Sequence, residues 1–260
     1  YIVTPHGGYN TIAMQKNAWV KKIYFQLFER TVLQDAYKIH CIGQSETTGL
    51  TSIFTNNKSI LLPYGFETQN PALQLSNDGG KFIIGFVGRL DIYTKGLDML
   101  INSFAAFAKE VPQTELWILG DSDERATLES LIVNQGLFDK IILFGSKFGQ
   151  EKDQIMAKMH VFVHPSRNEG LPASVLEAAS MGLPCIVSRA TNVAETIESF
   201  DAGIAVANEN TKEITAAMIN LYHNWKNNTL HLKGENAKKM VKSHFAWSAI
   251  LPQFDSLYGI

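Results

Sequence analysis

The sequence predicts an α/β protein in which helices cover both faces of a parallel sheet, the doubly wound arrangement. From residue 81 onward, short apolar runs alternate with longer amphipathic segments, and glycines or prolines mark the turns between them. This alternation is typical of consecutive βαβ units. Hydrophobic residues make up 45% of the 260-residue chain and charged residues 18%, which suits a globular protein with a sizeable core.

The expected elements follow one another regularly after residue 81. The helix over 96–111 is the clearest, because apolar side chains from Leu97 to Phe107 recur at helical spacing. Strands are expected at 81–88, 115–119, 141–144, 161–164, 185–187 and 203–206. Helices are expected at 96–111, 124–135, 152–158, 172–182, 193–199 and 212–224, followed by a helical tail over 232–258.

The chain before residue 66 is expected to hold a smaller set of strands and helices. Strands are expected at 1–4, 37–42 and 59–62, and helices at 13–36 and 45–54, the second with Ser45 as its N-cap. The helix over 13–36 carries Lys21, Lys22 and Arg30 among large apolar side chains. It is either an ordinary amphipathic surface helix or a helix whose basic face meets the acceptor or a membrane surface.

Charge and cysteine usage exclude several classes of protein. The net charge of −2 does not suit a nucleic-acid-binding protein, so we expect no nucleic-acid partner. Cys41 and Cys185 lie in apolar runs, which indicates buried thiols of a reducing compartment. No run of 18 apolar residues occurs, so we expect a cytoplasmic protein. The chain begins with Tyr1 inside an expected strand, so we expect it to be the C-terminal portion of a longer protein.

The segment 161–182 carries the strongest sign of a binding site. It is predicted to run from a strand through a loop into a helix that starts near Pro172, so the backbone N–H groups of Gly170 and Leu171 would be free to bind an anion. Glu169 precedes this helix and Glu177 lies inside it. The two carboxylates could hold the hydroxyls of a phosphorylated sugar. The alternative is that Glu169 interacts with the helix dipole and Glu177 is solvated.

A second loop, 88–96, follows another expected strand and contains Arg89 and Lys95. Two cations at the end of a strand could neutralise a diphosphate. Taken alone, they are equally explained as solvated loop charges. Ligands of doubly wound sheets bind at the carboxyl ends of the strands, so the two loops together favour a binding site.

These motifs together resemble the retaining glycosyltransferases of family 4, which have the GT-B fold of two Rossmann-like, doubly wound domains. The resemblance covers nearly the whole chain. The matching residues are Gly88-Arg89-Leu90, Lys95-Gly96, Gly120-Asp121, Phe144-Gly145, His164-Pro165-Ser166, the pair Glu169 and Glu177, and Gly182-Leu183-Pro184.

The resemblance also implies how the chain is divided. Residues 1–65 would be the last part of an N-terminal, acceptor-side domain, and 66–80 the interdomain linker. Residues 81–244 would be the nucleotide-sugar-binding domain, and 245–260 a crossover helix that returns to the first domain. The remaining N-terminal part of the same protein would complete the first domain.

The resemblance implies roles for the donor-side residues. Arg89 and Lys95 would bind the donor diphosphate, and Glu177 the ribose hydroxyls. The segment Ser146-Lys147 would lie near the nucleobase. Gly170 and Leu171 would offer backbone N–H groups to phosphate or sugar oxygens.

Two residues would act close to the reaction centre. Glu169 would contact the transferred sugar, and His6 matches a position where the family often carries an active-site histidine. His6 is otherwise explained as a turn or buried histidine. The chain departs from the family at Tyr64, where asparagine is usual, and at Pro172, which replaces a glycine and lacks an N–H group.

The sequence thus favours a retaining, metal-independent transferase that moves a hexose from a nucleotide-diphosphate sugar to a hydroxyl of a saccharide, lipid-linked or other small acceptor. No cofactor is expected. Peripheral contact with a membrane surface would suit a lipid-linked acceptor. The sequence Asp121-Ser122-Asp123 is expected to be structural or near the nucleotide, with no metal bound.

Two other functions stay open. One is a GT-B sugar-nucleotide epimerase or phosphorylase, although no signature of a pyridoxal phosphate lysine is present. The other is a nucleotide-binding regulatory module without turnover, because a fold alone does not fix a function.

Overall fold

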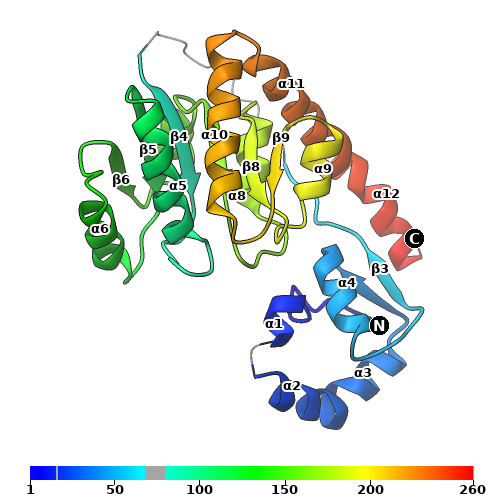
Figure 1. The fold of residues 1–260 in the computed structure, drawn as a ribbon. Coiled ribbons are helices and arrows are strands. Elements are labelled where there is room, and N and C mark those ends of the chain that lie inside the picture. The colour runs from blue at the N-terminus through cyan, green and yellow to red at the C-terminus, as the bar shows by residue number, and fades with distance from the viewer. Residues whose placement is uncertain (16, 68–79, 260) are drawn as a thin grey trace.

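The computed structural model describes residues 1–15, 17–67 and 80–259, which form two separate parallel sheets (Figure 1). We call the three-stranded sheet with its helices the smaller unit, and the six-stranded sheet with its helices the larger unit. Most of the segment expected as a linker, 66–80, lies outside the described residues.

The smaller unit contains the first three strands in the order β1-β2-β3. Its elements are β1 (Ile2–Val3), α1 (Thr11–Gln15), α2 (Ala18–Tyr24), the π-helix η1 (Phe25–Glu29), α3 (Arg30–Asp35), β2 (Lys38–Cys41), α4 (Gln44–Thr51) and β3 (Ser59–Leu61).

Two details of the smaller unit differ from the prediction. The single helix expected over 13–36 is interrupted at Asn17, whose φ of 55° places it in the left-handed region that asparagine tolerates. Ser45 is not the N-cap of α4, because the helix is preceded by Gly43 and Ser45 lies within its first turn. The Ser45 hydroxyl donates instead to the side chain of Asn10.

The larger unit has the doubly wound topology that the sequence predicted. Its strands are β4 (Phe82–Val87), β5 (Thr114–Leu119), β6 (Ile141–Gly145), β7 (Val161–His164), β8 (Cys185–Ser188) and β9 (Gly203–Val206). Its helices are α5 (Leu97–Glu110), α6 (Arg125–Asn134), α7 (Gly149–Met156), α8 (Ala173–Ser180), α9 (Ala194–Ser199), α10 (Thr211–Lys226) and α11 (Leu230–Met240). The strand order is β6-β5-β4-β7-β8-β9, with every neighbouring pair parallel.

Two hydrophobic layers cover the faces of the six-stranded sheet. Along β7, Val161 and Val163 pack into a layer with residues of α5 and α10, whereas Phe162 packs into a layer with α8, α9 and α11. This alternation follows from the two-residue period of a strand. It explains why these strands read as continuous apolar runs, as expected of a sheet buried on both sides.

The tail joins the two units. After α11 come the π-helix η2 (Val241–Phe245) and α12 (Trp247–Tyr258), so the continuous helix expected over 232–258 is interrupted at Ala246, which is extended. The interruption arises from a contact distant in sequence, because Phe66 bridges Ala246 and donates its N–H to the carbonyl of Phe245 at 2.6 Å. Helix α12 then runs alongside β3 (Figure 1) and packs its Ile250 and Leu257 against Leu62.

Candidate functional site

The site is built where the strand order of the larger unit reverses. Strands β4 and β7 are neighbours, but the strand that follows β4 in sequence lies on one side of the pair and the strand that follows β7 lies on the other. The loops 88–96 and 165–172 therefore diverge from adjacent strand ends. Such a switch point leaves a crevice at the carboxyl edge of the sheet, where ligands of these folds bind.

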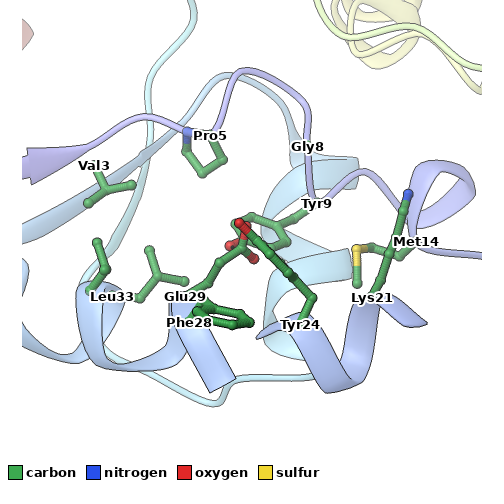
Figure 2. Close-up of a pocket in the computed structure, with 11 residues that line it drawn as sticks. Val3, Pro5, Gly8, Tyr9, Met14, Lys21, Tyr24, Phe28, Glu29 and Leu33 are labelled. Carbon is green, nitrogen blue, oxygen red and sulfur yellow. Dashed lines mark hydrogen bonds between the residues drawn. The ribbon is translucent and has the colours of Figure 1, made fainter. Parts of the chain in front are cut away.

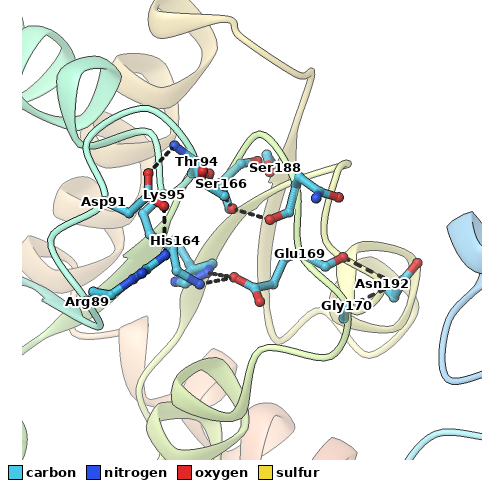
Figure 3. Close-up of polar contacts among 11 residues, drawn as sticks. Arg89, Asp91, Thr94, Lys95, His164, Ser166, Glu169, Gly170, Ser188 and Asn192 are labelled. Carbon is cyan, nitrogen blue, oxygen red and sulfur yellow. Dashed lines mark hydrogen bonds and ion pairs between the residues drawn. The ribbon is translucent and has the colours of Figure 1, made fainter. Parts of the chain in front are cut away.

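Glu169 is the central group of this crevice (Figure 3). Its Oε2 accepts hydrogen bonds from the Nζ of Lys95 and, at 3.1 Å, from Nε2 of His164. The side chains of Glu169 and Lys95 are about four-fifths buried, at 19% and 20% exposure. Because one carboxylate oxygen holds both donors, Oε1 is left to accept from a ligand.

His164 is buried at the end of β7 and holds Glu169 in position through its Nε2 hydrogen bond. Its ring stacks on Phe86 at a centroid distance of 5.7 Å and on Phe162 at 6.4 Å. Burial lowers the pKa of His164, so the ring is neutral and donates from Nε2. Its Nδ1 atom is buried and has no hydrogen-bond partner among the described residues.

Glu169 is held in its ionised form. Burial by itself would raise its pKa, but the hydrogen bond from His164 and the charge and hydrogen bond of Lys95 lower the pKa to about 2. The carboxylate is therefore charged at every physiological pH. It can stabilise positive charge or orient a hydroxyl, but it cannot supply a proton.

The two loops are tied together by backbone contacts. The Ser166 hydroxyl donates to the carbonyl of Thr94 at 2.7 Å, and the Arg167 N–H donates to the same oxygen at 2.9 Å. Gly96 has a φ of +68°, and a Cβ at this position would lie 2.3 Å from the carbonyl oxygen of Pro165. Residue 96 must therefore be glycine for the loops 88–96 and 165–172 to approach this closely.

Glu177 lies on α8, next to this crevice, and is held by one cation. Its Oε2 lies 2.8 Å from the Nζ of Lys152 on α7, and the Lys152 side chain is only 16% exposed. The first amides of α8 to find acceptors are those of Val175 and Leu176, both on the carbonyl of Pro172.

The N–H groups before these amides are directed toward no described acceptor, as an anion site requires. They are those of Gly170, Leu171, Ala173 and Ser174. Pro172 itself is the N-cap and not a member of the first helical turn, which corrects the prediction.

The other donor-side residues lie farther from Glu169. Arg89 follows β4, is 71% exposed and pairs with Asp91 at 2.9 Å. Ser146 and Lys147 follow β6, which β5 separates from β4, and Lys147 pairs with Glu151 at 2.5 Å. All of these residues lie at the carboxyl edge of the sheet, but they do not contact the Glu169 cluster.

His6 belongs to the smaller unit and does not contact Glu169. The two units meet at Asn192, which follows β8. Its side-chain Oδ1 accepts the Ser45 N–H at 3.2 Å, and its Nδ2 donates to the carbonyl of Gly170 at 3.0 Å. Glu46, in the same unit, accepts the N–H groups of Gly7, which follows His6, and of Ile42.

Sequence reasoning gave no role to His164, Lys152 or Asn192. His164 belongs to the motif His164-Pro165-Ser166, but a histidine at the end of an apolar strand is typical of a core residue. Lys152 was a surface lysine on a predicted helix, and only the fold brings it to Glu177. Asn192 had no signal, since its partners lie 22 and 147 residues away.

Other features of the described residues bear on metals and membranes. No group of three histidine, cysteine, aspartate or glutamate side chains among them could hold a metal ion. Asp121 of the Asp-x-Asp sequence pairs with Arg125 at 3.6 Å. In the part of the chain that the structure describes, no helix is long and apolar enough to cross a bilayer.

A pocket opens in the smaller unit between β1 and the helices α2, η1 and α3 (Figure 2). Its walls are largely apolar, and its polar groups include Tyr9, which donates to Glu29 at 2.7 Å. The pocket shares no lining residue with the Glu169 crevice.

The sequence profile of the family "Glycosyl transferases group 1" matches residues 71–240. The chain belongs to this family. The matched segment contains both glutamates, Arg89 and Lys95.

Among curated group 1 relatives, the gpi3 subunit of phosphatidylinositol N-acetylglucosaminyltransferase from Schizosaccharomyces pombe is 24% identical over 87% of this chain and 49% of its own length. An uncharacterised glycosyltransferase of Methanocaldococcus jannaschii is 30% identical over 70% of this chain and 46% of its own length. The chain thus spans about half the length of these relatives.

Solved structures confirm the GT-B fold that the sequence predicted. Sucrose-phosphate synthase from Thermosynechococcus elongatus superposes on 99% of this chain and 66% of its own with a TM-score of 0.82 at 21% identity. HepE from Anabaena in complex with UDP superposes on 100% of this chain and 72% of its own with a TM-score of 0.83 at 17% identity.

Proposed function

We propose that the complete protein is a retaining glycosyltransferase of family 4 that moves a hexose from a nucleotide-diphosphate sugar to a hydroxyl group. The single observation that carries this proposal is the Lys95–Glu169–His164 cluster, placed at the switch point of the larger sheet and beside the free amides of α8. It combines an ionised carboxylate, a cation and an anion site within one crevice.

The donor diphosphate would lie against the N-terminus of α8, with Lys95 and Arg89 compensating its charge. These cations and the backbone N–H groups of Gly170 and Leu171 would stabilise the departing nucleoside diphosphate. Arg89 is exposed and pairs only with Asp91 among the described residues, so it can turn toward a phosphate at little cost.

Glu177 would bind the ribose diol through the oxygen that does not face Lys152. Ser146 and Lys147 would lie beside the nucleobase. The free Oε1 of Glu169 would accept a hydroxyl of the transferred sugar, and its fixed negative charge would stabilise an oxocarbenium-like transition state.

We propose that no metal ion takes part. The cations of two loops and the amides of one helix can neutralise a diphosphate without one. The pairing of Asp121 with Arg125 leaves the Asp-x-Asp sequence poorly placed to clamp a metal.

The acceptor would be a saccharide or a lipid-linked sugar, bound on the side of the smaller unit. A lipid-linked acceptor is supported by an exposed apolar stripe on α2 and η1, which we define as Trp19, Ile23, Leu27 and Phe28, with exposures of 71%, 51%, 68% and 61%. Lys22, which precedes Ile23 in the sequence, is exposed as well. Aromatic side chains with flanking cations suit peripheral contact with an anionic bilayer.

The proposal is tested by incubating the complete protein with UDP-, GDP- and ADP-hexoses and measuring release of the nucleoside diphosphate with and without candidate acceptors. We expect release from one nucleotide class. Nucleotide binding without any release would favour the regulatory-module alternative, and formation of an epimerised sugar nucleotide would favour the epimerase.

A further inference from the structure

Tyr64 and His6 form a pair in the smaller unit. The Tyr64 hydroxyl lies 2.8 Å from Nδ1 of His6, and the two rings stack with centroids 5.8 Å apart. The His6 side chain is exposed, and among the described residues nothing contacts its Nε2.

The backbone beneath His6 is fixed independently of its ring. His6 has a φ of 55° and Gly7 a φ of 83°. A side chain other than glycine is held at positive φ only when its surroundings enforce it. The enforcing group is Glu46, which is fully buried and accepts the N–H of Gly7 at 2.5 Å.

The same carboxylate links the His6 loop to Ile42, a residue close to the larger unit. Its second oxygen accepts the N–H of Ile42 at 3.0 Å. The Ile42 side chain lies against Gly170, since a Cβ built on Gly170 would meet its Cδ1 at 3.4 Å. Three contacts, Gly7–Glu46, Glu46–Ile42 and Ile42–Gly170, therefore link the residue after His6 to the loop that carries Glu169.

Tyr64 is itself held in place. The ring of His40 packs edge-on against it at a centroid distance of 5.7 Å, and Nε2 of His40 lies 2.6 Å from the carbonyl oxygen of Leu62. The next residue, Gly65, leaves no room for a side chain, because a Cβ there would lie 2.2 Å from the Trp247 ring. The packing of His40 and Trp247 around residues 64 and 65 thus holds the Tyr64 hydroxyl in position beside His6.

We propose that Tyr64 is a positioning residue that sets the tautomer of His6: its hydroxyl donates to Nδ1, so that the proton resides on Nε2 and is offered to an oxygen of the bound sugar. The identity of that ligand rests on the proposed function, whereas the tautomer rests on the Tyr64–His6 contact alone.

Proton accounting supports this direction. The Tyr64 hydroxyl contacts no other group in the described part of the chain. If it accepted from a protonated Nδ1, the phenol proton and Nε2 would both lack a described partner, whereas donation to Nδ1 leaves only the Nε2 proton open to a ligand. Burial, and then the negative charge of Glu46, raise the pKa of Tyr64, which keeps the phenol protonated.

The test compares Tyr64→Phe with the matched control Tyr37→Phe in the complete protein. Tyr37 is an exposed tyrosine of the same unit that makes no described side-chain hydrogen bond. Nitrogen NMR of histidine-labelled protein, with the His6 signals assigned by His6→Gln, reports which ring nitrogen carries the proton. Donor turnover is measured in parallel.

In the wild type and in Tyr37→Phe we expect the neutral form of the His6 ring to carry its proton on Nε2. In Tyr64→Phe we expect both tautomers, together with a kcat lower by about 3- to 10-fold, the scale of one neutral hydrogen bond. The donor KM and the melting temperature should match those of Tyr37→Phe.

A His6 that carries its proton on Nδ1 in the wild type would overturn the inference, and so would a Tyr64→Phe protein with an unchanged His6 spectrum. These spectra do not depend on turnover. A wild type that turns over no donor would therefore count against the proposed function, while the spectra would still decide the role of Tyr64.

Discussion

The larger unit pairs carboxylates with cations, whereas the smaller unit pairs a histidine with a tyrosine. On the larger unit, Glu169 is bound to Lys95, and Glu177 to Lys152. On the smaller unit, His6 is bound to Tyr64. Under the proposed function, the larger unit would compensate the charge of the donor and the smaller unit would orient an uncharged part of it. We call this the division of labour.

The charged pairs also differ from one another. Glu169 is held by two donors in a buried setting, so its position and ionisation are fixed before any ligand arrives. Glu177 is held by Lys152 alone and keeps 29% of its side chain exposed. Fixed charge suits a group near the reaction centre, and an accessible carboxylate suits recognition of a diol.

Removing the charge of Glu169 should have the largest effect. Glu169→Gln preserves the size of the side chain but removes the negative charge beside the reacting sugar. We expect kcat to fall by about 100-fold or more, the scale of losing one preorganised electrostatic contact. Donor turnover is the measurement, and Glu198→Gln, which breaks an exposed pair with Arg189, is the control. Equal activity of the two variants would remove Glu169 from the reaction centre.

Glu177→Ala should act on binding rather than on turnover. Loss of a charged hydrogen bond to a ribose diol costs about 1.5–3 kcal/mol, so the nucleotide Kd should rise by roughly 10- to 150-fold. Lys152→Met keeps an unbranched side chain of similar size and should raise the Kd less, because the Glu177 side chain remains and loses only its support from Lys152. Calorimetric titration measures both. A smaller rise in the nucleotide Kd in Glu177→Ala than in Lys152→Met would contradict the proposal that Glu177 binds the ribose and Lys152 only supports it.

The dependence of folding stability on acid pH should report the pairing of Glu169. The pKa of Glu169 is lowered from 4.5 to about 2, so this carboxylate takes up its proton at a lower pH in the folded state than in the unfolded state. The Glu169 pairing therefore stabilises the fold above about pH 4.5, and this contribution is lost as the pH falls toward 2. It amounts to about 1–3 kcal/mol. Denaturant unfolding of wild type and Glu169→Gln should show a stability difference that shrinks between pH 5 and pH 3, and a constant difference would contradict this.

Membrane contact should give the smallest effect, and it tests the smaller unit. Replacing Trp19 and Phe28 of the apolar stripe by serine should weaken sedimentation of the complete protein with anionic vesicles, because the stripe loses buried apolar area. Turnover of a water-soluble acceptor should not change. If the double variant sediments like the wild type, the stripe is not a membrane contact.

The sequence predicted most of the fold because its strongest patterns are local. Strand β7 and helix α8 fall within about a residue or two of their predicted positions, since apolar runs, Pro172 and Gly182 mark them. The break at Ala246 was missed because its cause is Phe66, which lies far away in the sequence. Ser45 was misplaced because its hydroxyl binds Asn10, a partner that no local pattern reveals.

The candidate site, too, has a part that the sequence predicted and a part that only the fold shows. Lys95 and Glu169 could be placed at one sheet edge because both follow strands, and parallel strands end together. Their direct contact, and the support from His164, depend on which strands are neighbours, and the strand order appears only in the fold. The Lys152–Glu177 pair likewise needs the packing of α7 beside α8.

The most direct test of the division of labour is calorimetric titration of the complete protein with UDP, GDP and ADP in EDTA. We expect one of these nucleotides to bind, Glu177→Ala and Arg89→Ala each to weaken binding, and His6→Gln to leave the Kd unchanged, because the larger unit alone would hold the nucleotide. Binding that requires a divalent metal, or that is lost in His6→Gln but kept in Glu177→Ala, would contradict it.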